Sequence, residues 1–67
     1  MEEYVKRMID ELSQLSERTE KLSYFIALDE RFKALPQEEQ NLMRCQLNAM
    51  QIYKYALEQR LNMKIAN

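Results

Sequence analysis

The chain has 67 residues, and its ten basic and eleven acidic side chains give it a net charge of −1. This balance argues against binding to a nucleic-acid polymer, which depends on excess Lys and Arg, and no apolar run approaches the ~20 residues of a membrane span. Glycine and histidine are absent, which excludes glycine-rich nucleotide-binding loops and removes the commonest general base and metal ligand. Good helix formers dominate the rest. We therefore expect a single all-α domain, residues 1–67, with no metal, no cofactor and no membrane partner.

Residues 2–28 are predicted to form one long amphipathic helix. Thr19 is the one polar member of a heptad-spaced seam, whose apolar members are Val5, Met8, Leu12, Leu15, Leu22 and Ile26. The opposite side of the helix is charged, as is typical of a surface in contact with water. Such a helix needs a partner along the whole of its seam.

Residues 29–35 are predicted to connect this helix to a second one. Leu35 precedes Pro36, which disfavours the helical conformation at Leu35, and Pro36 suits the first turn of the helix that follows. Phe32 and Leu35 are apolar residues in a short connector. We expect them to fold down as a helical turn that closes one end of a hairpin.

The second helix, residues 36–65, has more apolar surface than one partner helix can cover. One stripe recurs at the alternating steps of a packing seam and consists of Met43, Leu47, Met50, Leu57 and Leu61. An adjoining stripe of mostly small or flexible residues consists of Leu42, Cys45, Ala49, Ile52, Ala56 and Met63. The first stripe can pack on residues 2–28, whereas the second requires another chain or a ligand.

A short connector makes the two helices antiparallel neighbours. Counting outward from it pairs Ile26 with Met43 and Met8 with Leu61, so the apolar layers match. A chain of this size buries only about 60% of its unfolded surface, and oligomerisation is a usual source of further support. We therefore predict an antiparallel two-helix hairpin that assembles through its second helix as a homo-oligomeric helical bundle.

Catalysis finds little support in the sequence. Adjacent acidic residues such as Asp10 and Glu11 splay across a helix surface and do not converge on a metal. Cys45 is a possible nucleophile, but a lone cysteine on an apolar helical stripe is more often a small core residue. The sequence predicts a protein that is not an enzyme and has no catalytic residue.

Gln46, Tyr53 and Arg60 form a row beside the packing seam of the second helix. An amide, a phenol and a guanidinium in one row could recognise a planar polar ligand, by bonding to a base edge, stacking on a base and clamping a phosphate. The alternative is that Arg60 pairs with Glu11 while Tyr53 and Gln46 line the rim of an oligomer interface. The pattern alone favours this alternative.

The run F-x-x-L-P-x-E-E-Q-x-L-M-R-x-Q-L-x-A-M-x-x-Y-x-x-x-L-x-x-R, from Phe32 to Arg60, resembles small helical bacteriophage proteins described as related to a crAss-like phage protein. Residues of the first helix also match the family's pattern, namely Tyr4, Arg7, Glu11, Lys21, Leu22, Phe25 and Ile26. One cysteine and an acidic N-terminus without a signal sequence indicate a reducing cytoplasm. The resemblance makes that the cytoplasm of an infected bacterial host.

Small phage hairpins of a broadly similar kind include oligomeric anti-defence sponges, which bind cyclic nucleotide messengers of bacterial immunity, such as those of CBASS and Thoeris, between protomers. By this analogy of shape and lifestyle, the chain would sequester a cyclic nucleotide or a cyclic ADP-ribose-type ligand. The positions assigned to phosphate and base contacts are then Arg7, Arg18, Gln46, Tyr53 and Arg60. Two alternatives stay open: an inhibitor or adaptor that docks its apolar face on a host protein, and a purely structural helical oligomer.

Overall fold

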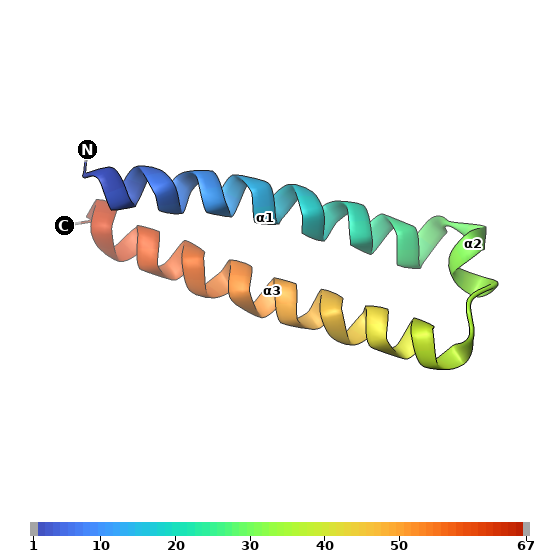
Figure 1. The fold of residues 1–67 in the computed structure, drawn as a ribbon. Helices are drawn as coiled ribbons and strands as arrows, with labels where there is room; N and C mark the ends of the chain where they lie inside the picture. The colour runs from blue at the N-terminus through green and yellow to red at the C-terminus, as the bar shows by residue number, and fades with distance from the viewer. Residues whose placement is uncertain (1, 67) are drawn as a thin grey trace.

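The computed structural model describes residues 2–66, which form three helices. The long helices α1 (Glu3–Leu28) and α3 (Gln37–Ala66) lie side by side and run in opposite directions, and the short helix α2 (Glu30–Lys33) joins them at one end (Figure 1). Both ends of the described chain lie at the other end of the rod, which measures 47 × 15 × 14 Å. The predicted all-α antiparallel hairpin is confirmed.

The side chains that hold α1 against α3 are the ones that the heptad spacing of α1 selects. Val5, Met8 and Leu15 are buried together with Leu57 and Leu61 of α3, and Leu12 and Met50 pack against this cluster. Thr19 is the buried polar residue of the seam, and its Oγ1 donates a 2.7 Å hydrogen bond to the carbonyl oxygen of Leu15. A threonine can therefore occupy the seam, because its hydroxyl bonds to its own helix and not to water.

The pairing of the two helices at their free ends fixes the register of the hairpin. The ammonium of Lys64 lies 5.3 Å from the centre of the Tyr4 ring, and a hydrogen bond with the Tyr4 hydroxyl raises the pKa of Lys64. One helical turn further in, Met8 and Leu61 belong to the same buried cluster. These contacts agree with the predicted layer in which Met8 lies opposite Leu61.

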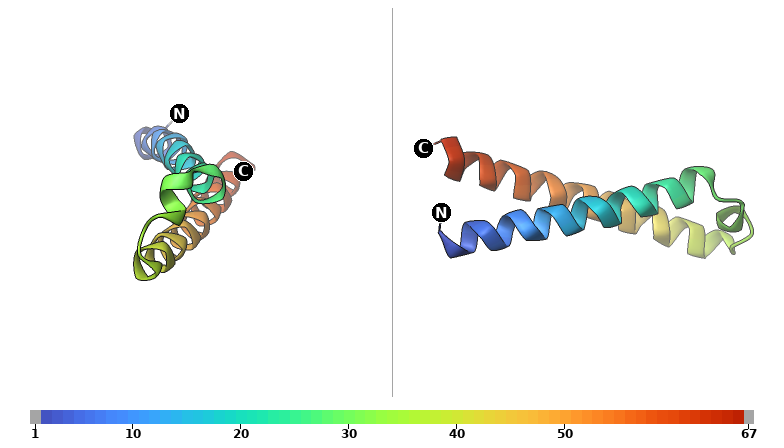
Figure 2. Two further views of the ribbon diagram at one scale, coloured as in Figure 1. Left: turned by 90° about the vertical axis from the view of Figure 1, so that its right-hand side faces the viewer. Right: turned by 90° about the horizontal axis from the view of Figure 1, so that it is seen from above.

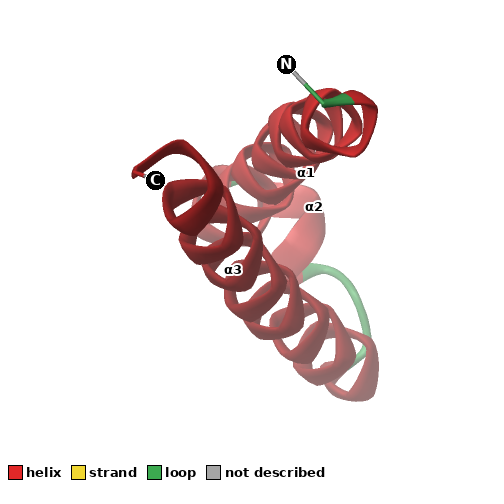
Figure 3. Cartoon of the chain, turned by 90° about the vertical axis from the view of Figure 1, so that its left-hand side faces the viewer, coloured by secondary structure: helices red, strands yellow, loops and turns green. Residues whose placement is uncertain are grey.

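The core is uneven along the rod. The helices separate toward α2 (Figure 1) and cross when seen from above (Figure 2). As a result, the layers predicted between α2 and the middle of the rod, including Ile26 with Met43, are only half-buried. The predicted layers thus match in apolar character but are not equally buried, and the less buried layers lie at the end of the rod where α2 joins the long helices, the far end in Figure 3.

The connector contains the short helical turn that the sequence predicted. Asp29 interrupts α1 with an extended backbone, and its carboxylate caps α2 by accepting a 2.9 Å hydrogen bond from the backbone N–H of Arg31. The same carboxylate accepts two bonds from the Arg31 guanidinium, at 3.0 and 2.7 Å. Pro36 stands just before α3, and its carbonyl accepts the first helical hydrogen bond, from Gln40.

Phe32 closes the α2 end of the hairpin. It is only 2% exposed, and its ring meets that of Phe25 edge to face, with centroids 6.1 Å apart. A guanidinium lies over each ring: Arg31 over Phe25 at 5.6 Å and Arg44 over Phe32 at 5.1 Å. These contacts tie the three helices together, since Phe25 lies on α1, Phe32 on α2 and Arg44 on α3.

The Asp29–Arg31 contact predicts how α2 responds to acid. Hydrogen bonds from the Arg31 side chain and backbone lower the pKa of Asp29 from 3.8 to about 2. Because the folded pKa lies below the ordinary value, the contact stabilises α2 fully above about pH 4, and this stabilisation is lost as the pH falls through about 2. An NMR titration of the Arg31 Nε–H resonance should show a transition near pH 2 in the wild type and none in Asp29→Asn. A midpoint near pH 4 in the wild type would contradict the contact.

Candidate functional site

The outer face of α3, which points away from α1, exposes large apolar side chains along its whole length. Ile52 is 70% exposed and Leu42 is 59% exposed. Ile52 and the fully buried Leu57 are separated by five residues, or about 140° around a helix with 3.6 residues per turn. α3 is therefore apolar both toward α1 and away from it, a pattern typical of a helix with neighbours on two sides.

Cys45 lies on this outer face and is exposed. The interpretation of Cys45 as a small core residue was therefore wrong for the single hairpin, whose core lies on the opposite side of α3. The stripe that contains Cys45, Ala49, Ile52 and Ala56 is exposed throughout. We call this surface, from Leu42 to Met63, the outer stripe.

Three of the predicted ligand residues form an exposed row along one edge of the outer stripe. Gln46, Tyr53 and Arg60 follow one another at seven-residue intervals on α3, so their backbones are about 10.5 Å apart along the axis. Tyr53 has 46% of its surface exposed. The row is accessible, but it is about 21 Å long and its members do not converge in the single hairpin.

Arg18 borders the same flank of the hairpin, whereas Arg7 is exposed about three turns away along α1. The opposite flank carries a groove in which Ser16 of α1 lies beside Gln51 of α3. Arg18 and Tyr53 each stand two residues further on, about 200° around their helices, and thus lie on the other flank. The Nε of Arg18 donates a 3.4 Å hydrogen bond to the carbonyl oxygen of Gln14 on its own helix.

None of the five predicted ligand residues lines any of the four surface depressions described within residues 2–66. Arg60 and Glu11 form no ion pair in this part of the chain, where the ion pairs are Lys21–Glu17 at 3.1 Å and Arg31–Asp29. The alternative to ligand binding, in which Arg60 forms a structural ion pair with Glu11, is therefore not supported by a contact between the two side chains.

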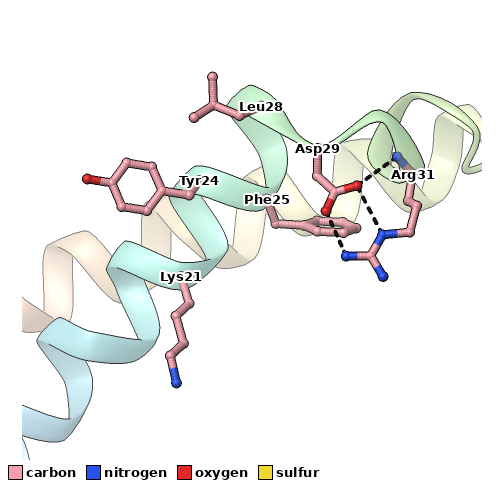
Figure 4. Close-up of a pocket in the computed structure, with 6 residues that line it drawn as sticks. All are labelled: Lys21, Tyr24, Phe25, Leu28, Asp29 and Arg31. Carbon is pink, nitrogen blue, oxygen red and sulfur yellow. Dashed lines mark hydrogen bonds and ion pairs between the residues drawn. The ribbon is translucent and has the colours of Figure 1, made fainter.

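A depression of about 460 Å³ lies at the elbow between α1 and α2 (Figure 4). We call it the elbow depression, and it is lined by Lys21, Tyr24, Phe25, Leu28, Asp29 and Arg31. Tyr24 and Leu28 extend outward from α1, while the guanidinium of Arg31 turns back to meet Asp29 beside the Phe25 ring. Aromatic rings beside cations could in principle accept a nucleotide.

The charges of the elbow depression are already satisfied within the chain. Arg31 binds Asp29 through two hydrogen bonds, and Lys21 pairs with Glu17 at 3.1 Å. An anion would have to compete with both carboxylates, so the geometry supports a structural role. Sequence reasoning missed the depression, although the spacing of Asp29 two residues before Arg31 is the signal of a side-chain cap.

A second, more polar groove of about 280 Å³ runs between α1 and α3 near the middle of the rod. Its walls include the hydroxyls of Ser16 and Ser23 and the amide of Gln51. Lys54 is half-buried there and makes no ion pair within the described residues. The groove thus places one cation, Lys54, and one carboxylate, Glu20, among neutral polar groups, on the flank opposite the predicted row.

The described residues offer neither a metal cluster nor a membrane-spanning helix. Residues 2–66 contain no group of three or more Cys, Asp or Glu side chains placed to hold a metal ion. Neither of the long helices, over the same residues, has an apolar stretch suited to crossing a bilayer.

A comparison with known families gives a match over most of the chain. The family model described as Sequestin matches residues 2–63, which include α1, α2 and nearly all of α3. Neither the curated proteins nor the solved structures gave a match. The matched range contains all five of the predicted ligand residues and the whole outer stripe.

Proposed function

The chain belongs to the Sequestin family, and we propose that it binds and sequesters a nucleotide second messenger of a host immune system without converting it chemically. A family name that denotes sequestration supports a binding role. The observation that carries the proposal is the exposed row of Gln46, Tyr53 and Arg60 beside an apolar surface. The protein would act in the cytoplasm of an infected bacterium, as a phage product that lowers the free concentration of the messenger.

Each member of the row suits one part of a cyclic nucleotide or a cyclic ADP-ribose-type ligand. The guanidinium of Arg60 can hold a phosphate by two parallel hydrogen bonds, and it makes no hydrogen bond or ion pair within the described chain. The ring of Tyr53 offers a stacking face for a base, and the amide of Gln46 can donate to and accept from a base edge. Arg18 on the same flank and Arg7 further along α1 supply additional positive charge.

The spacing of the row supports a homo-oligomer that binds its ligand between copies. The row from Gln46 to Arg60 is roughly 21 Å long, and its members do not converge in the single hairpin, so a second copy would be needed to complete a compact site. The outer stripe beside the row exposes Ile52 and Leu42, which a second copy would cover. We therefore include association through α3 in the proposed function.

The exposed outer stripe also favours a second candidate function. An apolar helical face can dock into the groove of another protein, so the hairpin would then act as an inhibitor or adaptor of a host protein. A purely structural oligomer would use the same face. A ligand screen separates these functions from sequestration, since neither requires Arg60 or Tyr53 to contact a small molecule.

Arg60→Ala should weaken ligand binding strongly with little change in folding. In a thermal-shift assay with cyclic dinucleotides and cyclic ADP-ribose isomers, a ligand at 100 times its Kd should stabilise the wild type by about 2.7 kcal/mol. Loss of a charged hydrogen bond costs about 1.5–3 kcal/mol, so calorimetry should show Kd rising by about 10- to 100-fold. Removal of this exposed side chain should change the free energy of unfolding by no more than about 0.5 kcal/mol.

Lys33→Ala is the matched control, because it removes the same charge from an exposed position on α2. It should leave both the melting temperature and the affinity unchanged. An Arg60→Ala protein that binds as tightly as the wild type would remove the row from the site. If no messenger in the panel shifts the wild-type melting temperature, the sequestration proposal fails and the docking function takes its place.

A further inference from the structure

We propose that the outer stripe of α3 is the seam of an antiparallel homodimer whose twofold axis passes between Met50 and Gln51. This inference rests on the proposed function for the idea of association, and it adds the partner, the direction and the register. The observations that carry it are the heptad order of the exposed residues and the distribution of charge along α3.

The outer stripe has the spacing of a second coiled-coil seam. One set of positions recurs every seven residues and holds Leu42, Ala49, Ala56 and Met63. The intervening positions, three residues after members of the first set, hold Cys45 and Ile52. All of these residues are exposed in the single hairpin, and alternation of two such sets at three and four residues is the order that lets helices interlock.

Charge along α3 favours an antiparallel over a parallel arrangement. Glu38 and Glu39 lie in the first turn of α3, whereas Arg60 and Lys64 lie near its other end. A parallel pair of α3 helices would place acidic ends together and basic ends together. An antiparallel pair places the acidic end of one copy beside the basic end of the other, and it also opposes the helix dipoles favourably.

One antiparallel register satisfies both the apolar and the polar positions. When Ala49 packs against the partner's Ile52, a small residue faces a large one, and Cys45 then faces the partner's Ala56. The same register brings Glu39 beside the partner's Arg60 on the edge of the seam. It also places Leu42, a larger apolar residue, over the aliphatic part of the partner's Gln59.

This register changes what the polar row can do. Gln46 comes to lie beside the partner's Tyr53, and the twofold axis repeats this pair, so two amides and two phenols gather at the centre of one edge of the dimer. In the single hairpin these side chains stand about 10.5 Å apart along α3. The dimer therefore places each Gln46 beside a Tyr53 of the other copy in a twofold-symmetric group, which suits a ligand built from two similar halves. Arg60 lies beyond this group at each end, where a ligand phosphate would compete with the partner's Glu39 for its guanidinium.

A charge reversal tests the register directly. Glu39→Arg and Arg60→Glu should each raise the Kd of dimerisation by about tenfold, because each replaces two symmetric ion pairs by like-charge contacts. The double variant E39R/R60E should restore the wild-type Kd, measured by sedimentation equilibrium. Within one chain the two positions are about 32 Å apart along α3, so only a contact between copies can produce the rescue. A double variant as weak as the single ones would overturn the register.

Cysteine cross-linking provides a second test that does not depend on the charged residues. In the proposed register, Ala56→Cys places a new thiol opposite the partner's Cys45, and mild oxidation should give a covalent dimer on a non-reducing gel. The wild type should remain uncross-linked, because its two Cys45 residues are separated by about 16 Å along the seam. Ala27→Cys, an exposed position on α1, is the matched control and should also stay monomeric on the gel.

A Cys45–Cys45 cross-link in the wild type would indicate a parallel seam and overturn the proposal, as would a wild type that sediments as a monomer. Circular dichroism of every variant should show the helical content of the wild type, since all the substituted positions are exposed. These measurements report association alone. A dimer in the proposed register that binds no nucleotide would overturn only the proposed ligand. A monomer that binds one would overturn this inference and the association through α3, but would leave the proposed ligand standing.

Discussion

Alanine in place of Leu57 should unfold most of the hairpin. Leu57 is 1% exposed and lies at the centre of the buried cluster with Met8, Leu15 and Leu61. Truncation of a buried leucine costs about 2–5 kcal/mol, whereas a chain of this length is expected to have a stability of only about 3–10 kcal/mol. Urea denaturation followed by circular dichroism should show a large decrease in the midpoint, or no cooperative transition at all.

Leu28→Ala is the matched control for this loss of packing. Leu28 is 76% exposed, so the same truncation should change the free energy of unfolding by no more than about 0.5 kcal/mol. Equal losses in the two variants would mean that the side chains of α1 and α3 do not pack as described. That outcome would place Leu57 outside the core.

Glutamate in place of Ile52 should prevent association at micromolar concentrations. Ile52 is exposed in the single hairpin, so the charge does not disturb the packing of α1 on α3. In the proposed dimer each copy would bury one carboxylate in an apolar seam, and burial of an unpaired charge costs several kcal/mol. We expect Kd for dimerisation to rise at least 100-fold, as measured by sedimentation velocity.

The melting temperature supplies an independent measure of the same effect. A wild type stabilised by association melts at a higher temperature when its concentration is raised, and Ile52→Glu should lose this dependence. Gln51→Glu is the control, because it adds the same charge on the neighbouring, groove-facing side of α3. A wild type whose melting temperature and sedimentation are independent of concentration would contradict an interface at Ile52.

The hairpin could be predicted from the sequence because its signals are strong and local. Heptad spacing in α1 identified Val5, Met8 and Leu15 as buried, and all three belong to the core. The lone Pro36 and the apolar Phe32 located the connector and its helical turn. Pattern and burial agree at these positions because a long helix with one apolar seam has only one way to bury it.

Features that depend on the relative positions of two helices could not be predicted from the sequence periodicity of either one. The divergence of the helices near Ile26 and Met43 follows from the volume of α2 and the cluster around Phe32, which periodicity does not encode. The elbow depression likewise depends on the bend at Asp29. The sequence placed Gln46, Tyr53 and Arg60 in one row beside the seam, and these side chains are exposed in the hairpin. Whether they share a site depends on a second copy of the chain, which helix periodicity does not encode.

The uneven core has a consequence for how the hairpin opens. Amide protons exchange with solvent through local unfolding, whose free energy is highest where packing is densest. In this chain the buried cluster extends from the end that holds the two termini, around Val5 and Leu61, whereas the apolar side chains nearest α2, such as Ile26 and Met43, are only half-buried, apart from Phe32. The packing between the start of α1 and the end of α3 thus holds the two helices together, and we expect them to separate most readily at the end joined by α2. Partial opening would therefore start at the loop and leave the termini joined, the reverse of ordinary fraying.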